Sequence, residues 1–227
     1  MIRFENVTKF YGDKIGLEKA NIEIADGEFV FLVGPSGAGK STFIRLILRE
    51  LEADDGKIVI NGDDITRYSN RQIPGLRRQI GMVFQDFKLL PNKTVFENVA
   101  LALEVTHTTA RSIRRQVPQV LMLMGIPDKA DRFPDELSAG EQQRVAIARA
   151  IVNRPKMIIA DEPTGNLDPD TAWEIMQLID QINKRGTTVV MVTHAKDLVN
   201  RMKKRVVAIE NGRIVRDSKE GEYGYDD

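Results

Sequence analysis

The sequence predicts an α/β protein in which helices cover a mostly parallel sheet, with a helical subdomain inserted into it. Three observations lead to this fold class. Short β-rich runs alternate with segments of helical periodicity over most of the chain. A glycine-rich motif, 34–41, lies between a predicted strand and a predicted helix. From about 86 to 136 the β-rich runs vanish and apolar residues recur at helical spacing.

The first 85 residues are expected to combine an antiparallel β part with the start of the parallel core. Strand-like runs lie at 2–7, 20–24 and 28–33, and turn signals separate them at Tyr11-Gly12-Asp13 and Asp26-Gly27. A helix should start near Gly39 and run to about Leu51. Strands are then expected at 57–60, which ends at the Asn61-Gly62 turn, and at 80–84.

The remaining elements follow the same reasoning. Helices at 95–105 and 113–124 form the predicted insert. After it we expect a helix at 140–153, a strand at 157–161, a helix at 170–184, a strand at 187–193, a helix at 196–202 and a hairpin at 206–215 that turns at Asn211-Gly212. This divides the chain into a β part with the first core segment (1–85), a helical subdomain (86–137), the second core segment (138–217) and a polar, acidic, frayed tail (218–227).

Composition narrows the function classes. Lys plus Arg and Asp plus Glu each number 33, and this balance argues against a dedicated nucleic-acid binder, so no nucleic-acid partner is expected. The absence of cysteine removes disulfides and thiolate chemistry. No apolar run approaches the roughly 18–20 residues that cross a bilayer, and the first residues show no signal-peptide pattern. We therefore expect a cytoplasmic protein that meets a membrane only through a partner.

The glycine-rich motif is a phosphate-binding signature. Its residues are Gly34, Pro35, Ser36, Gly37, Ala38, Gly39, Lys40 and Ser41, followed by Thr42. Glycines allow backbone N–H groups to turn inward as an anion nest, and the following helix adds its positive end. Lys40 should reach the β- and γ-phosphates of a nucleotide, and the Ser41 hydroxyl should bind Mg²⁺. ATP and Mg²⁺ are therefore the expected cofactors.

Two carboxylates end the apolar run 157–160. Asp161 and Glu162 follow it directly, and ligands of α/β sheets lie at the carboxyl ends of strands. Asp161 is then placed to hold Mg²⁺, and Glu162 to polarise the water that attacks the γ-phosphate. By itself the pattern is that of a strand entering a polar loop, but its pairing with the phosphate motif favours a metal site.

A helix start at 138 has two compatible interpretations. Ser138 with Glu141 three residues later is a capping box. The same hydroxyl, with Gly140 beside it, could also bind a phosphate at the helix N-terminus.

The segment Leu137-Ser138-Ala139-Gly140-Glu141 resembles the signature of the ABC ATPase family, and the resemblance extends over essentially the whole chain. It implies a P-loop NTPase core of the ABC type and a homodimer formed on ATP binding. Each ATP would lie between one subunit's phosphate loop and the signature of the other, formed by Ser138, Ala139, Gly140 and Glu141. Two positions depart from the family pattern: Ala139 where glycine is preferred, and Glu141 where glutamine is frequent.

Further residues match the family one by one. Tyr11 resembles the aromatic that stacks on adenine, although a tyrosine beside a turn is the simpler alternative. Gln85 resembles the glutamine that contacts Mg²⁺ and the γ-phosphate, Asp168 a residue of the loop that crosses the dimer interface, and His194, at the end of a strand, the histidine that grips the γ-phosphate. His107, in the insert, has no assigned role.

Within the family, the segment 161–168 resembles a branch that serves mechanotransmitting partners and lipoprotein or drug exporters. Inside that branch, the segments 85–91 and 94–100 are similar to members that work in bacterial cell division. The similarity implies an integral membrane partner, control of cell-wall hydrolysis and a place on the inner face of the membrane. The alternative within the family is an ATPase for lipoprotein release or drug export. Soluble ABC proteins acting on DNA or ribosomes, and small-molecule kinases, fit less well.

The partner is expected to dock on the segment after Gln85. Phe87, Leu89, Leu90 and Phe96 are large apolar residues near a predicted exposed loop, and such clusters mark interaction sites. The alternative is that they form the small core between insert and main domain.

Overall fold

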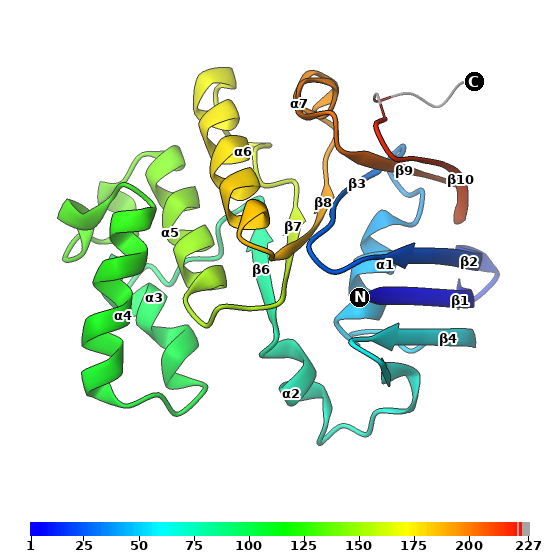
Figure 1. The fold of residues 1–227 in the computed structure, drawn as a ribbon, viewed down its shortest axis with the longest axis horizontal. Helices are drawn as coiled ribbons and strands as arrows, with labels where there is room; N and C mark the ends of the chain where they lie inside the picture. The colour runs from blue at the N-terminus through cyan, green and yellow to red at the C-terminus, as the bar shows by residue number, and fades with distance from the viewer. Residues whose placement is uncertain (222, 224–227) are drawn as a thin grey trace.

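A computed structural model describes residues 1–221 and 223, which form two sheets and a helical layer (Figure 1). The larger sheet has the order β10-β9-β3-β8-β7-β6. Its strands are β3 (Phe29–Val33), β6 (Ile80–Phe84), β7 (Met157–Asp161), β8 (Thr188–Val192), β9 (Arg205–Glu210) and β10 (Arg213–Ser218). All neighbours pair in parallel except β9 and β10. Every residue of β3 and β8 is buried, which agrees with their apolar sequences: β3 is apolar throughout, and β8 is apolar after Thr188.

The smaller sheet is antiparallel and has the order β2-β1-β4-β5. Its strands are β1 (Ile2–Tyr11), β2 (Lys14–Ile24), β4 (Asp55–Ile60) and the short β5 (Asp63–Asp64). The predicted turns at 12–13, 26–27 and 61–62 are present. Strands β1 and β2 run on to the turn that joins them, so both are longer than the sequence pattern predicted.

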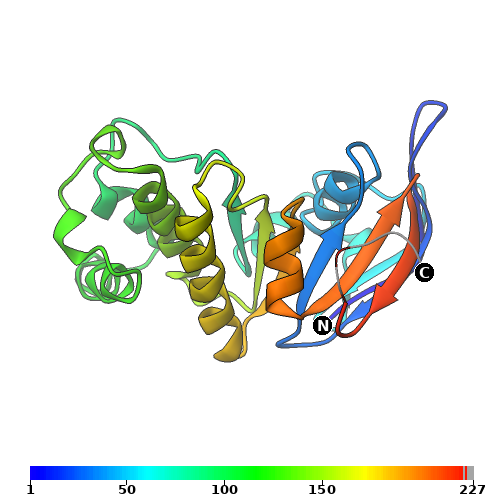
Figure 2. The same cartoon turned by 90° about the horizontal axis from the view of Figure 1, so that it is seen from above.

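The helices are α1 (Lys40–Ile47), α2 (Ile73–Arg77), α3 (Val95–Glu104), α4 (Ala110–Leu123), α5 (Ala139–Ile151), α6 (Pro169–Lys184) and α7 (Lys196–Met202). Helices α3, α4 and α5 gather at one end of the molecule and the antiparallel sheet at the other, as two perpendicular views show (Figures 1 and 2). Short 3-10 turns lie at Ile65–Arg67, Pro127–Lys129 and Pro134–Glu136.

Each face of the parallel sheet belongs to a different core. Phe31 and Val33 of β3 pack into the cluster that holds the apolar faces of α3 to α6. Val30 and Leu32, pointing the other way, pack with α1 and the antiparallel sheet. In that second cluster the rings of Phe4 and Phe43 stack, with centroids 4.3 Å apart and an interplanar angle of 11°. This contact ties β1 to the helix that follows the phosphate loop.

Helix α1 ends earlier than predicted, at Ile47 rather than near Leu51. Arg49 adopts a left-handed conformation (φ 52°), and the Glu50 N–H donates to Arg45 O at 2.9 Å. This is a Schellman motif. The sequence pattern did not predict it because the left-handed position holds arginine instead of the usual glycine.

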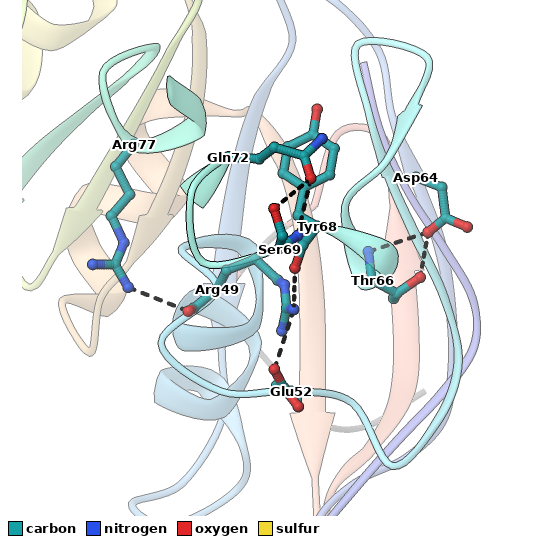
Figure 3. A network of polar contacts seen from close by, with 8 residues as sticks. All are labelled: Arg49, Glu52, Asp64, Thr66, Tyr68, Ser69, Gln72 and Arg77. Carbon is teal, nitrogen blue, oxygen red and sulfur yellow. Dashed lines mark hydrogen bonds and ion pairs between the residues drawn. The ribbon is translucent and has the colours of Figure 1, made fainter. Parts of the chain in front are cut away.

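A polar network fixes the segment from 49 to 77, whose short elements β5 and α2 the sequence pattern did not predict (Figure 3). The buried Arg49 donates through Nη2 to Tyr68 O (3.1 Å) and Glu52 Oε1 (3.3 Å). Arg77 of α2 donates through Nε to Leu48 O (2.9 Å) and through Nη2 to Arg49 O (3.2 Å). Helix α2 is therefore bonded to the C-terminal end of α1.

The predicted frayed tail was placed to begin at Ser218, but Ser218 is the last residue of β10 and pairs with Val206. Beyond it, the Tyr223 N–H donates to Asn200 Oδ1 at 2.6 Å. Residues 222 and 224–227 of the predicted tail lie outside the described residues.

We predict that Phe43→Ala destabilises the protein by about 3–5 kcal/mol, because it empties a fully buried site between β1 and α1. Denaturant unfolding measures the loss. Phe10→Ala is the matched control: Phe10 lies on β1 and is 46% exposed, so the stability lost on its replacement should stay below about 1 kcal/mol. Equal losses for the two variants would contradict this account of the core.

Candidate nucleotide site

The phosphate motif forms the loop between β3 and α1, as its spacing predicted. Gly34 and Gly39 have φ angles of 148° and 116°. A Cβ on Gly34 would lie 2.1 Å from Ile209 O, and one on Gly39 would lie 2.4 Å from Gly16 O. The Gly212 N–H also donates to Ala38 O at 2.8 Å. These glycines therefore permit close packing against the two β-hairpins, a requirement that the motif alone did not reveal.

Lys40 lies inside this loop and is 6% exposed. Its ammonium donates to Gly34 O (2.8 Å) and Pro35 O (2.9 Å), which leaves one of its three donors for another acceptor. Burial lowers the pKa of Lys40, while the charges of Glu162 and Asp161 act in the opposite direction.

The predicted carboxylate pair lies at the carboxyl end of β7. Burial raises the pKa of Asp161, and the neighbouring charge of Glu162 raises it further. Glu162 has a left-handed backbone (φ 49°), fixed by its N–H, which donates to Val192 O at 2.9 Å. Such backbone strain in a non-glycine residue is concentrated at functional sites. His194 Nε2 lies 3.4 Å from Glu162 Oε1. His194 itself stands two residues beyond β8, since that strand ends at Val192 and not next to the histidine.

A cavity of about 440 Å³ lies beside Asp161 and Glu162. Its lining residues are Ser41, Phe84, Gln85, Asp86, Asp161, Glu162 and Asn166. The sequence placed Asn166 only in the loop expected to cross the dimer interface, yet it also binds the glutamine: its Nδ2 donates to Gln85 O (3.0 Å) and its Oδ1 accepts from Gln85 Nε2 (3.3 Å). A hydroxyl, an amide and a carboxylate around one small cavity are the oxygen ligands that Mg²⁺ takes alongside phosphates and water, so the donor set fits this ion.

Tyr11 lies at the end of β1, beside the phosphate loop. Its hydroxyl is 3.3 Å from Thr42 Oγ1, and the residue is 43% exposed. A Cβ on Gly16 would lie 2.6 Å from the Tyr11 ring, so the ring rests on the glycine backbone of the adjoining strand. The tyrosine thus lies beside the phosphate loop, with its ring packed against β2, and its stacking on adenine stays a prediction.

The signature residues form a second site. Ser138 caps α5: its Oγ accepts from the Glu141 N–H at 3.3 Å, and its own N–H donates to Glu141 Oε2 at 2.9 Å. The Ser138 N–H and the Ser138 hydroxyl both donate to Glu141 Oε2, and these two bonds lower the pKa of Glu141. A cavity of about 360 Å³ is lined by Ser138, Ala139, Gly140, Glu141, Arg144, Asn166, Leu167, Asp168, Thr171 and Glu174. Only Asn166 is shared with the cavity at Ser41, so one chain does not bring its signature and phosphate loop into one pocket.

Asp168 caps α6, because its Oδ1 accepts from the Thr171 N–H at 3.0 Å. Hydrogen bonds from the Thr171 hydroxyl and from its N–H lower the pKa of Asp168. The residue therefore has a structural role within the chain, beside the signature cavity that it helps to line.

A phosphate loop with a buried lysine, facing a carboxylate pair, defines the class of nucleotide-hydrolysing α/β proteins, and comparison with known proteins identifies the branch. The sequence profile described as "ABC transporter" matches residues 17–165. The Cell division ATP-binding protein FtsE of Bacillus subtilis is 57% identical over 99% of both chains. The protein of the same name from Streptococcus pneumoniae is 54% identical over 100% of this chain and 99% of its own.

Solved structures agree. The dimeric ATP-binding cassette MJ0796, described in a post-hydrolysis state with ADP and Pi, superimposes with a TM-score of 0.87 at 36% identity. The match covers 98% of this chain and 100% of the other. The chain belongs to the ABC transporter family, and it is an ATP-binding ATPase. The family and fold expected from the sequence are thereby confirmed. None of the helices among residues 1–221 and 223 combines the length and the apolar character needed to span a bilayer.

We predict that Asp161→Asn stabilises the nucleotide-free protein near neutral pH. The folded-state pKa of Asp161 is raised, so its ionised form opposes folding at neutral pH, and this cost disappears once the pH falls below the ordinary value for Asp. Melting temperature should rise on the order of 2 °C at pH 7.5 and by less toward pH 4.

The opposite sign is expected at Asp54. Lys9 and the Phe10 N–H lower the pKa of Asp54, so Asp54→Asn should reduce stability at pH 7.5 and have less effect at acid pH. A stability gain from Asp161→Asn that is the same at both pH values would show that the charge of Asp161 is not its source.

Proposed function

We propose that the chain is the ATP-hydrolysing subunit of an FtsE/FtsX-like complex, in which ATP-driven dimerisation acts on an integral membrane partner that controls cell-wall hydrolysis during division. The observation that supports this role most is the 54–57% identity, over nearly full length, to proteins named for cell division. It favours division over lipoprotein release or drug export. The protein would be cytoplasmic, at the inner face of the membrane, with membrane contact only through its partner.

Hydrolysis follows from the groups around the Ser41 cavity. Lys40 and the loop N–H groups would bind the β- and γ-phosphates, and Tyr11 would stack on the adenine. Ser41, Gln85 and Asp161 would hold Mg²⁺, which neutralises phosphate charge when bound. Glu162 would accept a hydrogen bond from the attacking water, and its fixed backbone sets the direction of that carboxylate. His194, 3.4 Å from Glu162 Oε1, would hold the carboxylate on one side and the γ-phosphate on the other.

A head-to-tail homodimer would complete the site. Within one chain the signature cavity is separate from the phosphate loop, so the exposed Ser138, Ala139 and nearby Gly140 and Glu141 are available to a nucleotide bound by another copy. Asp168, which lines the same cavity, would lie at the dimer interface. The dimeric state described for MJ0796 supports this arrangement.

The partner's docking surface would be a groove of about 600 Å³ between α2, β6 and α3. Phe84 lines both this groove and the cavity at Ser41, which gives a direct connection between them. The docking residues expected from the sequence need revision. Leu89 and Phe96 pack against the main core, and Leu90, 38% exposed, does not line the groove. Apolar side chains that do line it include Met82, Leu101 and Val105, and a short helix of the membrane partner would fit there.

Lys40 and Glu162 should be separable by mutation. Lys40→Ala should weaken ATP binding, because the ammonium contacts phosphates before reaction. Glu162→Gln should retain binding and lower turnover at least about 100-fold, since the attacking water loses the negatively charged acceptor that polarises it. Nucleotide titration and phosphate release measure the two effects.

The trapped Glu162→Gln protein should also form dimers with saturating Mg-ATP, as sizing by light scattering would show, whereas Lys40→Ala should remain monomeric. A Glu162→Gln protein that binds ATP but stays monomeric would exclude the shared-site dimer.

Docking in the groove predicts that Val105→Asp loses co-purification with the membrane partner but keeps the basal ATPase rate within about twofold, since a charge is placed on an apolar contact surface. Val215→Asp is the control: Val105 is 53% exposed and Val215 51%, but Val215 lies on β10, away from the groove. Retention of the partner by Val105→Asp would refute this docking site.

A further inference from the structure

Arg149, in the last turn of α5, makes two hydrogen bonds that the proposed mechanism does not use. Its Nη1 donates to Lys88 O at 2.7 Å and its Nη2 donates to Phe87 O at 2.8 Å. No ion pair to a carboxylate accompanies this half-buried guanidinium among residues 1–221 and 223. Burial lowers the pKa of Arg149. A guanidinium removed from water in this way is tolerated only where its donors are satisfied, and here backbone carbonyls satisfy them.

The two acceptor residues have an unfavourable backbone. Phe87 and Lys88 are both left-handed, with φ angles of 58° and 49°, and neither is glycine. Consecutive non-glycine residues in this region are disfavoured and persist only where surrounding contacts impose them. One guanidinium that binds both carbonyls supplies such a contact.

This strained pair begins two residues after Gln85. The segment 85–90 is held by one side chain at each of three points. Asn166 bonds to Gln85, Arg149 to Phe87 and Lys88, and the fully buried Asn98 to both backbone groups of Leu90, at 2.8 and 3.1 Å. Of these three, only Arg149 comes from the helix that begins at the signature, so it links that helix to the glutamine segment.

Lys88 and Arg149 also line the proposed docking groove. The contact therefore lies between the groove, the signature helix α5 and the residue expected at the Mg²⁺ site. Movement of α5 relative to the sheet would act on the carbonyls of Phe87 and Lys88 first.

We propose that Arg149 is a positioning residue for hydrolysis: by binding the Phe87 and Lys88 carbonyls, it fixes the backbone that presents Gln85 to the nucleotide and makes that presentation depend on the position of the signature helix. This inference rests on the role of Gln85 in the proposed function. Arginine is required because its planar fork reaches two adjacent carbonyls, which the single ammonium of lysine does not match.

The test is a double-mutant cycle on the full chain with Arg149→Lys and Gln85→Ala, measuring kcat, KM for ATP and the Mg²⁺ concentration that gives half-maximal rate. Arg149→Lys should lower kcat about tenfold and raise the Mg²⁺ requirement, with KM changed less than about twofold. The double variant should be no slower than Gln85→Ala alone within about twofold, because both changes remove the same presentation of Gln85. Arg115→Lys is the control: Arg115 is exposed on α4, and its replacement should change neither kinetic constant.

Three results would overturn the inference. One is wild-type kcat and Mg²⁺ dependence in Arg149→Lys. Another is a fall in kcat of the double variant that equals the product of the two single falls, together with a lower melting temperature. Arg149 would then contribute only to packing. The third is an intact Gln85→Ala enzyme beside a slow Arg149→Lys enzyme, since Arg149 would then act through another group. Only this third result would also remove Gln85 from the proposed function.

Discussion

The structure depends on a contact between backbones. The phosphate loop can keep its shape because Gly34 and Gly39 bring no side chain to the places where Ile209 O and Gly16 O approach. One approach comes from the parallel sheet and the other from the antiparallel sheet, so the loop is held by both sheets at once. The loop in turn places Lys40 under the carboxyl end of β7, opposite Asp161 and Glu162. The site is thus a consequence of how the two sheets meet.

The charges brought together there oppose folding in the absence of a nucleotide. Burial lowers the pKa of Lys40 and raises the pKa of Asp161, so it disfavours the charged form of both side chains. Glu162 adds a second carboxylate and a left-handed backbone. A ligand that carries phosphates and a divalent cation supplies the missing counter-charges. Binding energy would therefore be spent in relieving an arrangement that the fold imposes, a common trade between stability and activity.

The sequence predicted the parallel core well because its strands are continuous apolar runs that end in motif residues. It also located Ser41, Gln85, Asp161 and Glu162 at one cavity, but not the other residues that line it, Phe84, Asp86 and Asn166. The sequence pattern did not predict contacts between segments that are far apart in the chain. The left-handed Arg49 that ends α1 lacks the glycine that signals such an ending, and β5 and α2 are too short to show a period. Leu89 and Phe96 were expected at a docking surface, but their burial depends on how the insert packs, which spacing does not encode.

The strand order of the larger sheet has a consequence for protein synthesis. Strand β3 lies between β8 and β9, which are encoded much later in the chain, whereas β1, β2 and β4 are all complete by residue 60. On the ribosome the antiparallel sheet can pair early, but the glycine-rich loop lacks its neighbours from the β9–β10 hairpin, Ile209 and Gly212, until that hairpin has emerged. The loop is therefore completed only late in translation, and β3, an entirely apolar strand, stays without its partner strands β8 and β9 during that interval, when it is open to pairing with other chains.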